Sequence, residues 1–230
     1  MRFPNAAKGV KKIFTAEILN LLSTFFLVVT VALIVIGVAG AAGTAGDAGI
    51  ENSQAAMEVL GGSILIAGIF ALVWFVLAFI AFIMNLVGII NASHDEQNFK
   101  SALIFLIVGI VTAILAGIFY NNGTVSSLLY SLHSLLNLFV YIFVIAGVVK
   151  LADQMNRGDV SARGTNVLKL IIVINVLALI ASLISTFMGG PVASVTAGVL
   201  LLVGIVLGIV QYIMYLTFLA KAKKMLAENK

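Results

Sequence analysis

The chain has 230 residues, of which 62% are hydrophobic and only 10% are charged, with a net charge of +4. A soluble globular domain carries roughly 25% charged residues, so this composition excludes a protein that water covers on all sides. The lack of cysteine excludes disulfides, thiolate metal sites and cysteine nucleophiles. We therefore expect an integral membrane protein, and we interpret the positive charge as basic flanks of membrane spans rather than as a nucleic-acid surface.

Six segments are long and apolar enough, or nearly so, to cross a bilayer as helices, for which about 20 residues are needed. In chain order they are residues 18–42, 60–90, 102–119, 125–149, 167–187 and 192–219. Strands of a membrane β-barrel would alternate polar and apolar residues, and these segments do not alternate. The sequence thus predicts an all-α fold, with one transmembrane domain over residues 1–230 and six spans.

The segment before the first span, Phe3–Lys12, is expected to start a helix with Asn5 as its N-cap. Lys8 and Lys12 then share one face, which either holds anionic lipid or is an ordinary basic flank, and we favour the flank. The basic start, the apolar run and the small residues 38–43 also resemble a secretory signal peptide. The apolar run of about 25 residues exceeds the roughly 7–15 of a signal peptide, so we expect a retained first helix.

Three connections are expected on the side away from the basic residues. The first, Gly43–Val59, is long, acidic and rich in Gly, Ala and Ser, and we expect a loop there, with a helical turn inside it as the alternative. The other two are tight turns, Asn121–Thr124 and Met188–Pro191, with Pro191 placed to open the sixth helix. Turns this short require antiparallel neighbours, so the spans are expected to pair into three hairpins.

The fourth span is expected to carry a continuous polar face. Its polar residues recur at helical spacing, on one face or directly beside it: Ser127, Tyr130, His133, Ser134, Asn137 and Tyr141. Lipid cannot satisfy such a stripe, which must therefore face protein or water. We favour hydrogen bonding between helices, and a small polar cavity open to the outside is the alternative. Asn85, Asn175 and Gln211 are single polar residues of other spans that could join such a network, but each is expected to be structural.

Small residues spaced by four mark two expected packing faces. Gly109, Ala113 and Gly117 lie in the third span, and Gly204 and Gly208 lie in the sixth. Such spacing lets backbones approach closely, either within the bundle or in a homo-oligomer.

Two strings on the basic side, Gly88–Glu96 and Gly147–Asp153, both run from a glycine into a connection between hairpins. A threefold duplication of one hairpin would explain them, and chance similarity is the alternative.

Charge orients the spans. All 13 Lys and Arg residues fall on the same side if the chain has six spans, whereas five or seven spans would scatter them. The positive-inside rule places this side, and with it both termini, in the cytoplasm.

The residues for an enzyme are lacking. His94, Asp95 and Glu96 are potential metal ligands, but adjacent loop residues do not converge on one metal by themselves. The string Gly61–Ser63 resembles a nucleophile turn only loosely, without a base predicted nearby. A buried carboxylate near the middle of a span, which a proton-coupled transporter usually needs, is not found either. We expect no catalytic residue, no metal and no cofactor.

The string Asn91–Leu103 closes one span and opens the next, and it resembles inner-loop strings of small multi-pass membrane proteins of Gram-positive bacteria. The start of the chain, Phe3–Lys12, is similar to the same proteins, and the two strings cover about a tenth of the chain. The resemblance implies the cytoplasmic membrane of a bacterium. It implies nothing about chemistry, since those proteins have no assigned activity.

Two functions fit these expectations. We favour a non-catalytic membrane scaffold or accessory subunit, whose partners are the lipid bilayer and another membrane protein or a second copy of this chain. The alternative is a small-solute permease, or the substrate-binding subunit of a transporter, that holds a small molecule at the polar face of the fourth span. A water-accessible cavity beside Tyr130, Ser134 and Asn137 would favour the alternative.

Overall fold

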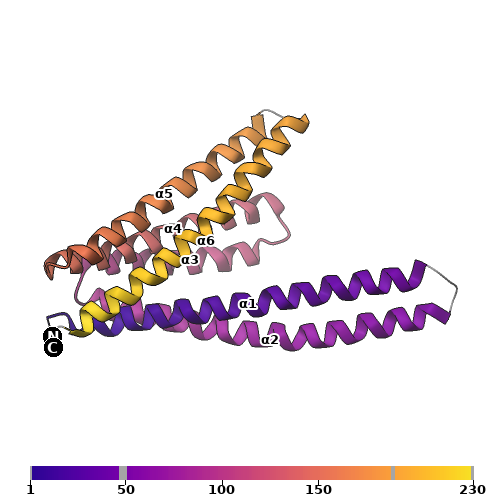
Figure 1. The fold of residues 1–230 in the computed structure, drawn as a ribbon, viewed down its shortest axis with the longest axis horizontal. Coiled ribbons are helices and arrows are strands. Elements are labelled where there is room, and N and C mark those ends of the chain that lie inside the picture. Colours follow the sequence, from indigo (N-terminus) through magenta and orange to yellow (C-terminus); the bar gives the residue numbers. More distant parts are fainter. Residues whose placement is uncertain (1, 47–50, 188–189, 229–230) are drawn as a thin grey trace. The chain divides into compact units, whose positions relative to one another are not determined.

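The structure is a computed structural model that describes the backbone of residues 2–46, 51–187 and 190–228. Within these ranges the chain forms six helices and no strand (Figure 1). The helices are α1 (Pro4–Gly46), α2 (Glu51–Ser93), α3 (Gln97–Ile118), α4 (Gly123–Gln154), α5 (Gly158–Phe187) and α6 (Gly190–Glu228). Each predicted span falls on one of them, and all six are long and apolar enough to cross a membrane. The prediction of an all-α fold with six candidate spans is confirmed.

The helices extend well beyond the apolar segments that predicted them. Both α1 and α2 have 43 residues, which at 1.5 Å per residue is about 64 Å, roughly twice the thickness of the hydrocarbon core. The prediction of a loop over Gly43–Val59 is wrong, because α1 continues to Gly46 and α2 begins at Glu51. Polarity suggested a loop, but Glu, Gln, Ala and Met favour helix whether or not they are apolar. Of the predicted turn Met188–Pro191, the first two residues lie outside the described ranges, and Pro191 is in the first turn of α6 as expected.

The chain divides into two compact units, of which unit 2 comprises residues 15–85. It consists of the remaining parts of α1 and α2, which pack along each other. A Cβ atom on Gly37 of α1 would overlap the hydroxyl group of Ser63 on α2, and the rings of Phe26 and Phe70 lie 5.8 Å apart. A small residue thus lets the two helices approach closely in this unit.

Unit 1 comprises residues 1–14 and 86–230, and it contains the main hydrophobic core. The core residues lie in the parts of the helices that carry most of the basic residues. We call this region the basic end, and it comprises residues 6–13, 89–106, 140–171 and 215–226. Each helix contributes a fully buried side chain to it: Ile13 of α1, Ile89 of α2, Phe99 of α3, Leu151 of α4, Val160 of α5 and Phe218 of α6. Segments of all six helices therefore share one core in unit 1.

Glycines permit the closest helix contacts of the basic end. A Cβ atom on Gly9 of α1 would lie 2.5 Å from the carbonyl oxygen of Gly88 on α2. A Cβ atom on Gly147 of α4 would lie 2.7 Å from the ring of Phe99 on α3. Gly88 and Gly147 begin the two similar strings of the sequence, and each faces the other helix of its own hairpin. The two glycines thus have equivalent places in their hairpins, and the duplication stays a hypothesis.

The connection between α2 and α3 ties helix ends together. One carboxylate oxygen of Asp95 accepts a hydrogen bond from the backbone N–H of Ala6 at 2.7 Å, and the other accepts from the Asn5 side chain at 2.9 Å. The prediction that Asn5 is the N-cap of α1 is therefore wrong. The helix starts at Pro4, and Asp95 supplies the capping carboxylate. Local sequence could not reveal a cap that comes from another part of the chain.

Glu96, the next residue, has two roles. It is the N-cap of α3, where its carboxylate accepts from the backbone N–H of Asn98 at 2.6 Å, and it forms an ion pair with Lys150 of α4 at 3.1 Å. Its side chain is only 2% exposed, whereas that of Lys150 is 53% exposed. The acidic loop residues thus serve as structural ties, and no group of three metal-ligating side chains occurs among the described residues.

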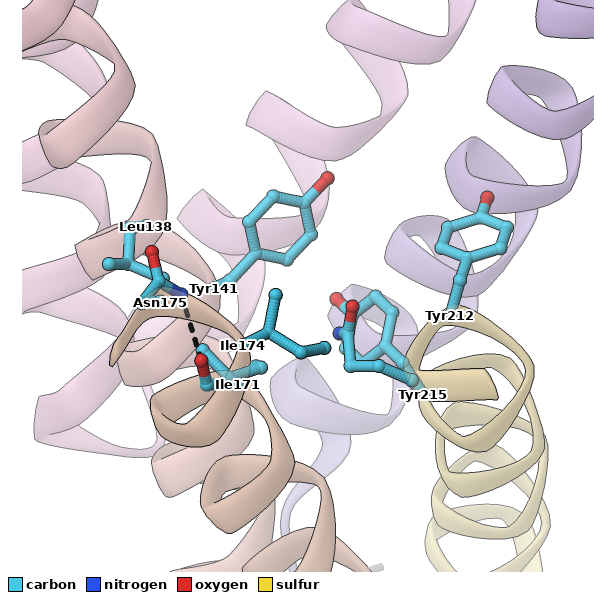
Figure 2. Close-up of a pocket in the computed structure, with 8 residues that line it drawn as sticks. Leu138, Tyr141, Ile171, Ile174, Asn175, Tyr212 and Tyr215 are labelled. Carbon is cyan, nitrogen blue, oxygen red and sulfur yellow. Dashed lines mark hydrogen bonds between the residues drawn. The ribbon is translucent and has the colours of Figure 1, made fainter. Parts of the chain in front are cut away.

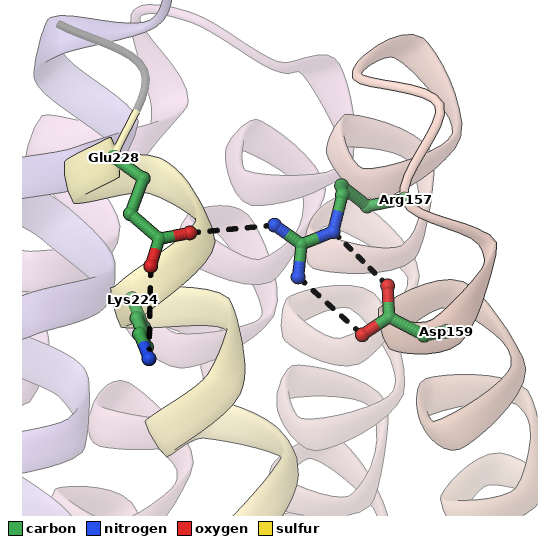
Figure 3. A network of polar contacts seen from close by, with 4 residues as sticks. All are labelled: Arg157, Asp159, Lys224 and Glu228. Atoms are coloured by element: carbon green, nitrogen blue, oxygen red, sulfur yellow. Dashed lines mark hydrogen bonds and ion pairs between the residues drawn. The ribbon is translucent and has the colours of Figure 1, made fainter.

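Exposed ion pairs join the end of α6 to the turn between α4 and α5 (Figure 3). Arg157 contacts Asp159 at 3.1 Å and Glu228 at 3.5 Å, and Glu228 also pairs with Lys224. The hydrogen bond from Arg157 holds the pKa of the Asp159 carboxyl group below its ordinary value. Because water surrounds these groups, the pairs contribute little to stability.

Candidate functional site

The six polar residues of the fourth span do not line one cavity. Along α4 they separate into three places: an open groove, a hydrogen-bond network with α3, and a pocket shared with α5 and α6. The stripe is continuous in sequence, but the helices that face it change along its length.

His133 and Asn137 form the network. His133 Nδ1 lies 2.9 Å from the carbonyl oxygen of Gly109 on α3, and the Asn137 side-chain nitrogen lies 2.9 Å from His133 Nε2. A carbonyl oxygen can only accept, so Nδ1 carries the hydrogen and Nε2 accepts from the amide of Asn137. The imidazole thereby links α4 to α3. His133 thus makes the interhelical hydrogen bond that we favoured for the whole stripe, and Asn137 supports it from the same helix.

Ser127, Tyr130 and Ser134 line the groove near the α3–α4 turn. The groove has a volume of about 630 Å³ and is widely open. Its remaining lining residues are Tyr120, Gly123, Ser126 and Ser131. Two of its serines bond to backbone oxygens, Ser126 to that of Ala116 on α3 and Ser131 to that of Ser127. Asn137 does not line this groove, so the cavity expected beside Tyr130, Ser134 and Asn137 is only partly present.

Tyr141 lies at a separate pocket that three helices enclose in part (Figure 2). The pocket has a volume of about 240 Å³. Its lining comes from α4, α5 and α6: Leu138, Tyr141, Ile171, Ile174, Asn175, Gln211, Tyr212 and Tyr215. We call it the three-helix pocket. It brings together Tyr141, Asn175 and Gln211, which are far apart in sequence.

Aromatic rings and amides dominate the polar part of the three-helix pocket. The rings of Tyr141 and Tyr215 meet edge to face, with centroids 5.6 Å apart and planes at 79°, a favoured geometry for aromatic pairs. The side-chain nitrogen of Asn175 donates to the backbone oxygen of Ile171 at 2.8 Å, which fixes the amide against its own helix. Gln211 and Tyr212 complete the wall on α6.

Packing at the basic end explains why these residues meet. Gly164 of α5 sits against α4 and α6, since a Cβ atom there would overlap Val149 and lie 2.7 Å from the ring of Phe218. The polar lining residues lie within about 17 Å of this contact along their own helices. The pocket therefore lies near a close contact of the three helices.

Sequence reasoning found Tyr141 as part of a stripe and treated Asn175 and Gln211 as isolated. Tyr212 and Tyr215 were missed, although Gln211 and Tyr215 are spaced by four and share a face of α6. That spacing was the signal in the sequence that could have identified them. It identifies a face, but not the helices that lie opposite to it.

The polar side chains that line the three-helix pocket are tyrosines and amides. None of its lining residues is Asp, Glu, Lys, Arg or His. The lining therefore offers no pair of a general acid and a general base. The string Gly61–Ser63 lies inside α2, where the Ser63 hydroxyl group donates to the backbone oxygen of Leu60 at 2.9 Å. It is therefore not a strained turn that presents a nucleophile.

Comparison of the chain with protein-family models, with curated proteins and with solved structures finds no match.

Proposed function

We propose that the protein is a non-catalytic multi-pass membrane protein that binds a small uncharged molecule in the three-helix pocket, as a permease or the substrate-binding subunit of a transporter does. The observation that carries this proposal is the convergence of Tyr141, Asn175 and Gln211 from three helices on one pocket. Single polar residues of membrane helices need partners that lipid does not supply. A concave, mostly apolar site with a few convergent polar groups is the usual form of a small-molecule site.

We propose further that the basic end faces the cytoplasm of a bacterium, in agreement with the one-sided distribution of Lys and Arg. Asn175 follows Lys169 by six residues, and Gln211 precedes Lys221 by ten. These offsets correspond to about 9 and 15 Å along the helices. The pocket then lies in the inner half of the hydrocarbon core, which is about 30 Å thick.

A scaffold or accessory subunit is the second candidate, and the glycines of α6 favour it. A Cβ atom on Gly204 or on Gly208 would meet nothing within 4 Å, whereas one on Gly109 would contact His133 and Leu136 at 3.7 Å. Within the described chain, the spacing by four on α6 thus has no packing partner. Substitution of both α6 glycines by leucine is expected to abolish co-purification of a partner or a second copy, and unchanged co-purification would contradict this candidate.

The binding proposal is tested by extracting the protein with its native lipids and recording mass spectra of what it retains. We expect a small molecule that stays with the wild type and is lost from an Asn175→Leu, Gln211→Leu double variant. Asn85→Leu is the matched control, because it removes a polar amide from a span of unit 2. Equal retention by the double variant and the wild type would contradict binding in the three-helix pocket.

A further inference from the structure

We infer that the three-helix pocket takes the head of a neutral lipid: a small uncharged group that carries oxygen atoms, attached to an apolar chain that stays in the bilayer. The inference rests on the proposed function and on the proposed depth of the pocket. It specifies the class of ligand from the size of the pocket, its lining and the surface that borders it.

Size limits what can enter. A volume of about 240 Å³ corresponds to roughly eight water molecules at 30 Å³ each. A ring or a short head group fits such a space, but a complete lipid does not. Any chain attached to the head must therefore lie outside the pocket.

The lining selects an uncharged head. A charged group in a dry site needs an opposite charge, and the lining residues contain none. The amides of Asn175 and Gln211 offer hydrogen-bond donors and acceptors, which suit carbonyl and hydroxyl groups. The rings of Tyr141 and Tyr215, which meet edge to face, add an apolar aromatic surface against which the carbon atoms of the head can pack.

The border of the pocket suits an apolar chain. On α5, Ile172 and Val176 flank Asn175 and are 58% and 48% exposed. On α6, Val210 adjoins Gln211 and is 44% exposed. The surface beside the polar groups is thus aliphatic, and in a membrane it faces lipid tails. A ligand dissolved in the bilayer can place its chain there while its head occupies the pocket.

Several neutral lipids share this chemistry, and the experiment distinguishes them. The full-length protein is placed in nanodiscs of phosphatidylglycerol that contain a long-chain quinone, a long-chain polyprenol or a diacylglycerol, and retained lipids are identified by native mass spectrometry. In parallel, a chain-free naphthoquinone and glycerol are offered in solution. We expect at least one of the chained lipids to be retained, and neither of the chain-free heads.

Variants locate the binding. Gln211→Leu is expected to weaken retention of the neutral lipid about tenfold, the effect of one to two lost hydrogen bonds, while the Asn85→Leu control retains it. A second variant, Tyr212→Leu, reshapes the wall and is expected to weaken retention as well. Circular dichroism establishes that each variant keeps the helix content of the wild type.

Two outcomes would overturn the inference. If the chain-free heads are retained as well as the chained lipids, and Gln211→Leu loses them, the lipid class is wrong but the binding function stands. If Gln211→Leu and Tyr212→Leu retain the neutral lipid as the wild type does, the lipid lies on the outer surface of the protein. Failure of the proposed binding function gives a different result. In that case neither the chained lipids nor the chain-free heads are retained, and no native ligand co-purifies with the wild type.

Discussion

Asp95 caps α1 from the connection between α2 and α3, since its carboxylate accepts from the backbone N–H of Ala6 at 2.7 Å across 89 residues of sequence. Loss of a capping side chain typically costs about 1–2 kcal/mol. Asp95→Ala is therefore expected to lower the apparent Tm of the purified protein in detergent. Asp153→Ala, at an exposed position near the end of α4, is the matched control and is expected to leave the Tm unchanged. Equal Tm values for both variants would contradict the capping role.

The pair of Glu96 and Lys150 permits a double-mutant cycle. Lys150→Met leaves a buried carboxylate without its cation, and we expect a loss of about 1–3 kcal/mol in the free energy of unfolding. Glu96→Gln keeps an oxygen that can cap α3 but removes the charge. Lys150→Met should therefore cost little in the Glu96→Gln background. Additive effects of the two substitutions would show that the residues do not interact.

Two glycines that look alike in sequence should respond differently to alanine. Gly147→Ala would place its Cβ atom 2.7 Å from the ring of Phe99, which is fully buried and cannot move away. We expect destabilisation of about 1–3 kcal/mol from this overpacking. Gly204→Ala meets nothing within 4 Å and is expected to leave the Tm unchanged or to raise it. Thermal denaturation of both variants decides the matter, and a larger loss at Gly204 would be the contrary result.

The link between α3 and α4 through His133 is expected to be weak. Hydrogen bonds between membrane helices average about 0.6 kcal/mol, because the unpacked helix also finds partners. Asn137→Leu should thus cause only a small drop in Tm and should leave ligand retention in the three-helix pocket intact. Ligand loss in Asn137→Leu would mean that the polar face of α4 acts as one site after all.

The spans could be predicted from sequence because lipid leaves the backbone of a long apolar segment little choice but helix. The ends of the helices could not be predicted, since residues 51–58 are too polar to indicate a span but include the good helix formers Glu, Gln, Ala and Met. The cap on α1 was also out of reach, because Asp95 is remote from Ala6 in sequence and only packing brings it there.

The candidate site shows a similar limit. The periodicity of α4 identified Tyr141, and the spacing of Gln211 and Tyr215 marks one face of α6. Whether two such faces meet depends on how far each helix is rotated and shifted against its neighbour. Gly164 sets this contact by its lack of a side chain, which hydropathy does not record. The three-helix pocket therefore required the structure.

Orientation in the membrane can be tested directly, because the chain has no cysteine and each single-cysteine variant carries one thiol. Tyr120→Cys lies at the α3–α4 turn, whereas Lys8→Cys and Lys224→Cys lie at the basic end, and all three positions are exposed. We expect a membrane-impermeant maleimide to label Tyr120→Cys in intact bacterial cells. The two variants at the basic end should be labelled only after permeabilisation, and labelling with a permeant maleimide provides the control for reactivity. If Lys8→Cys and Lys224→Cys differ from each other, the number of spans is odd. If both are labelled in intact cells and Tyr120→Cys is not, the basic end faces outward and the three-helix pocket lies in the outer half of the membrane.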